Sequence, residues 1–120
     1  MPDLVYESIP ELSESEISAA IETNNSNELS TVALSAALHL ANHKLAEEIC
    51  IKLAEHSNPV VRGNALLGFG HIARIDGKLD EIKVKHLIRK GLADRDEFVA
   101  GQAESAKDDI ESFLGWIFEE

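Results

Sequence analysis

SNPVVRGNALLGFGHIARI, residues 57–75, is the stretch of sequence that decides the fold. Asn58 and Pro59 signal a turn, and a proline in the first helical turn already has helical backbone geometry. After the proline, apolar and small residues recur at helical spacing on one face, and the opposite face is hardly more polar. The first face carries Val61, Ala65, Gly68, Ile72 and Ile75. The opposite face carries Val60, Leu66, Leu67, Gly70 and Ala73. A helix that is apolar nearly all round is a buried one, so we expect a central helix that its neighbours cover.

An internal repeat surrounds this helix. Helical spacing predicts further helices at about 13–23, 28–42, 44–56, 80–93 and 97–118. When the apolar positions of residues 44–75 are moved by 38, they fall on those of the last two helices, and all ten pairs stay apolar or small. The pairs are Ala46 and Val84, Ile49 and Leu87, Cys50 and Ile88, Leu53 and Gly91, Ala54 and Leu92, Val61 and Val99, Ala65 and Ala103, Gly68 and Ala106, Ile72 and Ile110, and Ile75 and Phe113. A looser copy lies upstream at an offset of 32. A two-helix unit repeated near every 40 residues is typical of a stacked repeat fold.

The period, the helix pair and the stretch NPVVRGNA, residues 58–65, resemble a HEAT repeat. The resemblance implies an all-α fold, a short right-handed α-solenoid of about three antiparallel helix pairs. The family pattern places an acid in the turn between the helices and Val-Arg after it. The second copy keeps the acid as Asp94 without the arginine, whereas the first copy keeps Arg62 and has His56 in place of the acid. Stacking is therefore expected to bring Arg62 and Asp94 together as a structural pair.

The whole chain, residues 1–120, is expected to be a single HEAT-like domain. Its expected divisions are an extended lead-in over residues 1–12, a divergent first repeat over 13–43, a second repeat over 44–79 and a third repeat over 80–120. No stretch is apolar enough to span a membrane, and the acidic N-terminus does not resemble a signal peptide. The lone cysteine, Cys50, excludes an internal disulfide. We therefore expect a cytoplasmic protein.

Charge is the outlying feature of the composition. The chain has 22 acidic residues and 11 lysines or arginines, a formal net charge of −11. The electric field of so negative a protein repels nucleic acid, whose binding relies on contacts of lysine and arginine with phosphates. It also repels anionic membrane surfaces. It speeds association with a basic protein. Solubility alone is the alternative explanation, and the composition does not decide between the two.

No residue pattern indicates a catalytic centre, a metal site or a bound cofactor. His39 and His43 are one helical turn apart, but the run lacks the glutamate of a zinc protease motif and a third ligand. Gly63, Gly68 and Gly70 do not make a phosphate-binding loop, since no Gly-Lys-Ser/Thr follows. Their expected role is close helix packing, and Cys50 is expected to be a buried, inert thiol. The sequence thus predicts a protein that is not an enzyme.

The last predicted helix carries the candidate binding site. Its expected core face consists of Val99, Ala103, Ala106, Ile110, Phe113, Leu114 and Ile117. Roughly opposite lie Glu97, Glu104, Asp108 and Glu111, with Asp109 on a flank and Trp116 along one edge. Like charges one turn apart oppose helix formation, and aromatic residues are frequent in binding hot spots. Two alternatives remain open: an ordinary solvated face, and a Trp116 that only covers the open end of the stack.

These features favour a non-catalytic protein-binding module with a basic protein as its partner. The most concrete version is a bacterial immunity protein, acidic and small, that neutralises a basic, nuclease-type toxin by direct binding. The alternative is a HEAT-like scaffold, chaperone or lyase that acts on a cofactor-bearing protein. That alternative needs a groove with a polar catalytic group, and the sequence offers no candidate for one.

Overall fold

The computed structural model describes residues 9–118, and this part of the chain is all-α, with six helices and no strand. The helices are α2 (Glu14–Thr23), α3 (Ser26–His39), α4 (His43–Leu53), α5 (Pro59–Asp76), α6 (Glu81–Leu92) and α7 (Glu97–Leu114). The predicted all-α class is confirmed. Of the predicted lead-in, residues 1–12, the first eight residues lie outside the described part of the chain. No helix within residues 9–118 is long and apolar enough to cross a bilayer.

Each helix begins at a side chain that accepts hydrogen bonds from the first turn, as N-caps do. Ser13 and Glu16 form a reciprocal capping box at α2. The other N-caps are Asn25, Asn42, Asn58, Asp80 and Asp96. Gly77 and Gly115 end α5 and α7 in the left-handed conformation, at φ of 75° and 72°. A glycine adopts this conformation without strain, so both long helices stop at a glycine.

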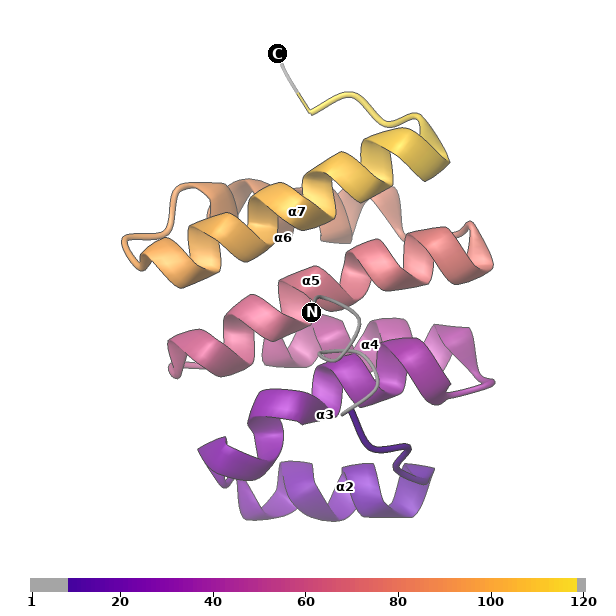
Figure 1. Cartoon of the computed structure of the whole chain (residues 1–120), viewed down its shortest axis with the longest axis vertical. Coiled ribbons are helices and arrows are strands. Elements are labelled where there is room, and N and C mark those ends of the chain that lie inside the picture. Colours follow the sequence, from indigo (N-terminus) through magenta and orange to yellow (C-terminus); the bar gives the residue numbers. More distant parts are fainter. Residues whose placement is uncertain (1–8, 119–120) are drawn as a thin grey trace.

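The helices stack along the long axis of the molecule, with α2 at one end and α7 at the other (Figure 1). In this view α3, α5 and α7 lie side by side in front, and α4 and α6 lie behind them. The central helix α5 contacts α3, α4, α6 and α7. Its buried residues include Val61, Ala65, Leu66, Phe69 and Ile72. The central position that the sequence predicts for this helix is confirmed, and the helix is buried between Val61 and Ala73 on the faces that meet its neighbours.

Polar side chains connect the three helices of the front layer. The Asn64 side-chain amide donates to the Ser30 carbonyl oxygen, joining α5 to α3. Gln102 Nε2 donates to Asn64 Oδ1 at 2.9 Å, joining α7 to α5. Behind this layer the buried Glu47 carboxylate accepts the backbone N–H of Asp80, which ties α4 to the start of α6. These bonds hold helices whose apolar residues already pack together.

Glycine permits the closest helix approaches. A Cβ at Gly63 would lie 2.8 Å from the Phe98 ring, and one at Gly68 would lie 2.7 Å from Cys50 Sγ. A Cβ at Gly70 would lie 3.2 Å from Ala106 Cα. These separations are shorter than ordinary van der Waals contacts. The geometry supports the packing role that the sequence suggests for Gly63, Gly68 and Gly70.

Alanine substitutions at two helical glycines should have opposite effects on stability. A Cβ at Gly91 would lie 2.5 Å from Leu66 Cδ1 and 3.0 Å from Ala103 Cβ, and neither neighbour can leave the core easily. We expect Gly91→Ala to lower the free energy of unfolding by about 1–2 kcal/mol through overpacking. A Cβ at Gly101 meets nothing within 4 Å, so Gly101→Ala should raise that free energy by about 0.5–1 kcal/mol. Urea unfolding of both variants tests the difference in sign, and equal stabilisation would contradict a packing role for Gly91.

Several predicted boundaries and core positions are wrong. The last helix ends at Leu114, not at residue 118, because Gly115 turns the chain out of the helix. Phe113 and Ile117, expected in the core, are 51% and 72% exposed, and Ile75 is 43% exposed. The helix predicted at 28–42 spans Ser26–His39, so His39 ends α3 while His43 begins α4. The two histidines therefore do not lie on one helix, because Leu40 leaves the helical conformation.

Candidate functional site

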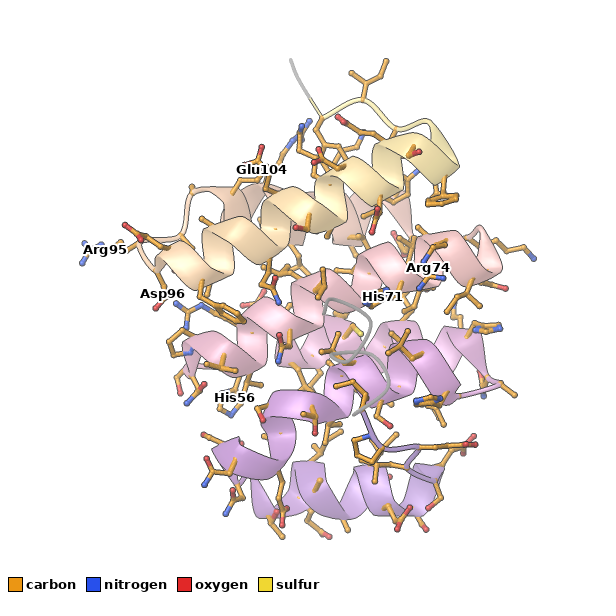
Figure 2. The ribbon with its side chains drawn as sticks, viewed as in Figure 1. His56, His71, Arg74, Arg95, Asp96 and Glu104 are labelled. Atoms are coloured by element: carbon orange, nitrogen blue, oxygen red, sulfur yellow. The ribbon has the colours of Figure 1, made fainter. Side chains whose placement is uncertain are left out.

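The acidic stripe, which we define as Glu97, Glu104, Asp108 and Glu111, lies on the outer side of α7. These residues follow one face of the helix, opposite the buried Val99, Ala103, Ala106 and Ile110. Glu97, Glu104 and Asp108 are exposed, and Glu111 is half-buried beside Lys107, whose Nζ lies 3.6 Å from its carboxylate. Figure 2 shows Glu104 on the side of α7 that faces away from α5. Lys107 is the one cation that α7 carries against five acids, so the stripe remains strongly negative.

Asp109 faces α5 and is separated from the stripe. Its Oδ2 would lie 3.1 Å from a Cβ at Gly70. Burial raises the pKa of the Asp109 carboxyl, an effect that Arg74 opposes and Asp108 reinforces. Arg74 also donates to His71 Nδ1 at 3.1 Å, and both residues lie on α5 (Figure 2). Burial, followed by the Arg74 charge, lowers the pKa of His71 to about 4, so this imidazole is neutral at pH 7.

Trp116 lies beyond the end of α7, in the segment that turns back over α6. Its ring centroid lies 5.8 Å from Lys85 Nζ and 6.1 Å from the Phe118 ring. Arg89 Nη2 donates to the Phe118 carbonyl oxygen at 3.3 Å, and Phe118 is buried. Through these contacts residues 115–118, which we call the tail, cover one side of α6. The lysine lies at cation–π distance from the indole, so Trp116 contacts α6 through Lys85.

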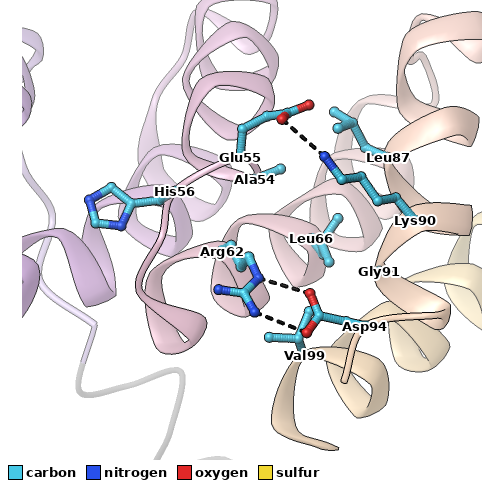
Figure 3. A pocket seen from close by; sticks show the side chains of 10 residues that line it. All are labelled: Ala54, Glu55, His56, Arg62, Leu66, Leu87, Lys90, Gly91, Asp94 and Val99. Carbon is cyan, nitrogen blue, oxygen red and sulfur yellow. Dashed lines mark hydrogen bonds and ion pairs between the residues drawn. The ribbon is translucent and has the colours of Figure 1, made fainter. Parts of the chain in front are cut away.

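Arg62 and Asp94 form a bidentate ion pair between α5 and the turn before α7. Arg62 Nε lies 2.9 Å from Asp94 Oδ2, and Arg62 Nη2 lies 2.9 Å from Asp94 Oδ1 (Figure 3). Arg62 Nη1 also donates to the Ser57 carbonyl oxygen, and Asp94 Oδ1 accepts the Asp96 N–H, each at 2.9 Å. The arginine, followed by this backbone bond, lowers the pKa of Asp94 to about 2. Both groups are therefore charged at neutral pH and fix the turn against α5.

His56 holds the preceding turn in the same way as Asp94 holds the turn before α7. Its Nδ1 accepts the N–H of the N-cap Asn58 at 3.0 Å, just as Asp94 accepts that of the N-cap Asp96. Its Nε2 bonds to Asn24 Oδ1 at 2.9 Å and so reaches the turn before α3. The imidazole thus replaces the expected acid, because a neutral ring can accept at one nitrogen and donate at the other.

A cavity of about 250 Å³ opens beside the Arg62–Asp94 pair, between the turn before α5 and the turn before α7 (Figure 3). Leu66, Leu87 and Val99 form apolar parts of its wall. At its edge Lys90 Nζ lies 3.2 Å from Glu55 Oε1, and both side chains are more than half exposed. Asp94 is a poor general base because its proton affinity is low and Arg62 occupies both oxygens. The arrangement suits the seating of a side chain better than acid–base chemistry.

Other candidate reactive groups are equally unsuited to catalysis. Cys50 is fully buried, with Sγ 3.7 Å from the Ala33 carbonyl oxygen, and burial raises its pKa to about 12. A thiol that stays protonated is neither a nucleophile nor a metal ligand. His39 Nε2 donates to the Ile9 carbonyl oxygen at 3.2 Å. Within residues 9–118, no three His, Cys, Asp or Glu side chains converge in a way that could hold a metal ion.

The stability that Asp94 contributes should depend on pH. Because its pKa falls from 3.8 to about 2 on folding, the unfolded chain binds more protons than the folded chain between these values. The contribution of Asp94 is therefore complete above about pH 4 and is lost as the pH falls through about 2. We expect the difference in urea midpoint between wild type and Asp94→Asn to shrink between pH 5 and pH 2. In an Arg62→Ala background this difference should be small throughout. A difference that persists at the lowest pH would contradict the ion pair as its source.

The sequence pattern does not predict the cavity or the C-terminal segment that covers α6. The turn residues that line the cavity come from two repeats, and only the packing of α4–α5 on α6–α7 brings them together. One feature of the sequence indicates where the tail begins: Gly115 lies 38 residues after Gly77, which is the offset of the repeat. Both glycines end a long helix in the left-handed conformation, so the repeat itself marks the end of α7.

No model of a known protein family matches the chain, and no curated protein matches its sequence. Among solved structures, the fold is similar to that of a chain in the crystal structure of a CDI complex from Cupriavidus taiwanensis LMG 19424. The TM-score is 0.75 and the sequence identity is 22%, and the alignment covers 88% of this chain and 94% of that chain. At this identity the similarity shows a shared fold.

Proposed function

We propose that this protein is an immunity protein, a non-catalytic binding module that neutralises a toxin by direct contact. The observation that carries the proposal is the fold shared with a chain of a CDI complex over nearly the full length of both chains. CDI stands for contact-dependent inhibition, in which a toxin is paired with its immunity protein. The two roles in such a complex are those of the toxin and of its inhibitor. The net charge of −11 and the inert Cys50 and Asp94 favour the inhibitor over the toxin.

The partner that we propose is a basic protein, most concretely a toxin of the nuclease type that acts in the cytoplasm. Nucleases that bind a phosphate backbone need lysine and arginine at their surface. An acidic inhibitor attracts such a surface over long range and associates quickly. We place the contact on the acidic stripe of α7, because its carboxylates are exposed along one face. Asp109 and Trp116 are left out of this contact, since they face α5 and α6.

We further propose that the helices form a short right-handed HEAT-like solenoid of about three helix pairs. Three correspondences at the offset of 38 support this proposal. The N-caps Asn58 and Asp96 make the same bonds, and so do the turn residues His56 and Asp94. Gly77 and Gly115 end their helices alike. Repeated packing of one unit on the next generates such a stack.

Co-expression with the neighbouring toxin tests the function. The C-terminal domain of a secreted toxin encoded beside this gene would be produced in bacterial cells with and without this protein. We expect growth arrest without it, recovery with it, and co-purification of the two proteins. A truncated chain lacking α6 and α7, matched for expression, should not protect. If the intact protein neither binds the toxin domain nor restores growth, the immunity function is excluded for that pair.

A further inference from the structure

The negative charge is unevenly distributed along the chain. Residues 9–42, which include α2 and α3, carry five glutamates and no lysine or arginine. Residues 43–96 carry eight acids against ten lysines or arginines, and residues 97–118 carry five acids against one lysine. Since α2 and α7 lie at opposite ends of a molecule 39 Å long (Figure 1), the acidic ends are separated by a nearly neutral middle. The end formed by α2 and α3 is not part of the acidic stripe.

An apolar groove crosses this second acidic end. It has a volume of about 480 Å³ and lies between α2 and α3, beside the segment that precedes α2. Leu12, Ala20 and Val32 provide its apolar floor. Glu16 and Glu28 line it as well, and both are exposed. The described residues that line the groove include no lysine or arginine. An apolar groove lined by carboxylates is complementary to an apolar segment that carries positive charge.

The two glutamates lie at opposite ends of the groove. Glu16 is in the first turn of α2, where its Oε1 accepts the Ser13 N–H at 2.8 Å. Glu28 is in the first turn of α3, and its Oε1 accepts from Thr23 Oγ1, in the last turn of α2, at 3.3 Å. Glu16 and Thr23 are seven residues apart on one helix, which corresponds to about 10 Å along its axis. Because the Glu16 carboxylate reaches back to Ser13, the two carboxylates are separated by roughly two to three turns of helix.

We propose that this groove binds a basic amphipathic helix of a partner protein. Two cations seven residues apart lie about 10 Å apart along a helix, and their long, flexible side chains can extend to the carboxylates of Glu16 and Glu28 at the two ends of the groove. Two apolar side chains between them, three and four residues after the first cation, lie on the same helix face and enter the groove. A second copy of this chain is a poor occupant, since the net charge of −11 opposes self-association. This inference does not depend on the partner being a toxin.

A synthetic peptide tests the inference directly. The probe is a capped helical peptide of about 15 residues, long enough to form a helix, with two lysines and two leucines at these spacings on an alanine and glutamine background. It would be titrated into the full-length isotope-labelled protein, and the amide signals followed by NMR. We expect shifts concentrated at Ala19, Ala20, Thr23, Thr31 and Val32. The same peptide with alanine for leucine, or with glutamate for lysine, should bind more weakly.

Paired variants of the protein identify the site. Glu16→Gln with Glu28→Gln should weaken binding of the peptide roughly fivefold, since two partly exposed ion pairs are lost. Glutamine keeps the capping box and the acceptor for Thr23, so the variant should fold, and thermal unfolding checks this. The matched control, Glu104→Gln with Asp108→Asn, loses the same charge on α7 and should leave the affinity unchanged. Equal loss in both variants, shifts centred on α7, or equal binding of the leucine-free peptide would overturn the proposal. A concentration-dependent dimer that the Glu16 and Glu28 variant abolishes would assign the groove to a second copy instead.

Discussion

Arg62→Ala will lower the free energy of unfolding by about 1–3 kcal/mol, because it leaves the Asp94 carboxylate without its partner in a turn that is largely shielded from water. The side chains of Arg62 and Asp94 are only 22% and 16% exposed. The arginine also loses its bond to the Ser57 carbonyl oxygen, so two turns are released together. Urea unfolding at pH 7 is the measurement.

Two comparisons separate the ion pair from general effects of removing an arginine. Arg95→Ala removes an exposed arginine from the same turn and should change the free energy of unfolding by less than about 0.5 kcal/mol. Combining Arg62→Ala with Asp94→Ala should cost less than the sum of the single substitutions, because both remove one interaction. If Arg62→Ala and Asp94→Ala are each neutral, the pair does not stabilise the fold.

The sequence predicted the helices well because local signals agree with the tertiary packing. The cap residues Ser13, Asn58 and Asp96 each bind the first turn that follows them. The apolar periodicity of residues 57–75 predicted a buried helix, and Val61, Ala65 and Phe69 are fully buried. Where propensity, capping and burial point the same way, a single sequence suffices for the assignment.

The repeat shows that positions are equivalent, but it does not show that they are buried. Ile75 and Phe113 are paired by the offset of 38, and both are exposed. The helices α5 and α7 have 18 residues each, whereas α4 and α6 have 11 and 12. At 1.5 Å per residue α5 and α7 are longer than α4 and α6 by about 10 Å, so these shorter partners cannot cover them along their whole length. Ile75 and Phe113 both lie within the last two residues of these long helices.

The sequence predicts the relative positions of the candidate site residues only where they follow one helix. Glu97, Glu104 and Asp108 share a face of α7 because helical periodicity places them there. The positions of Asp109 and Trp116 depend on contacts with α5 and α6, which a single-helix pattern does not contain. The groove between α2 and α3 is not predicted for the same reason, since it exists only where two helices meet.

Reversing two charges of the acidic stripe, Glu104→Lys with Asp108→Lys, should slow association with the basic partner by roughly tenfold at low salt, because steering by the protein's field is reduced. The fold should be kept, since both residues are exposed and like charges one turn apart oppose the helix. The wild-type rate should fall as salt rises, because the Debye length shrinks to about 10 Å at 0.1 M. Association kinetics at two salt concentrations with the toxin domain provide the measurement.

A charge-matched control decides whether the position of the acids matters or only their number. Glu22→Lys with Glu48→Lys makes the same change in net charge on α2 and α4, where both glutamates are exposed. The two double variants are compared at 0.1 M salt, where we expect this control to slow association only slightly, because its charges lie farther from the stripe than the Debye length of about 10 Å. Should both double variants associate equally slowly, net charge alone drives encounter. If the Glu104 and Asp108 variant instead associates as fast as wild type, the acidic stripe is an ordinary solvated face and the partner binds elsewhere.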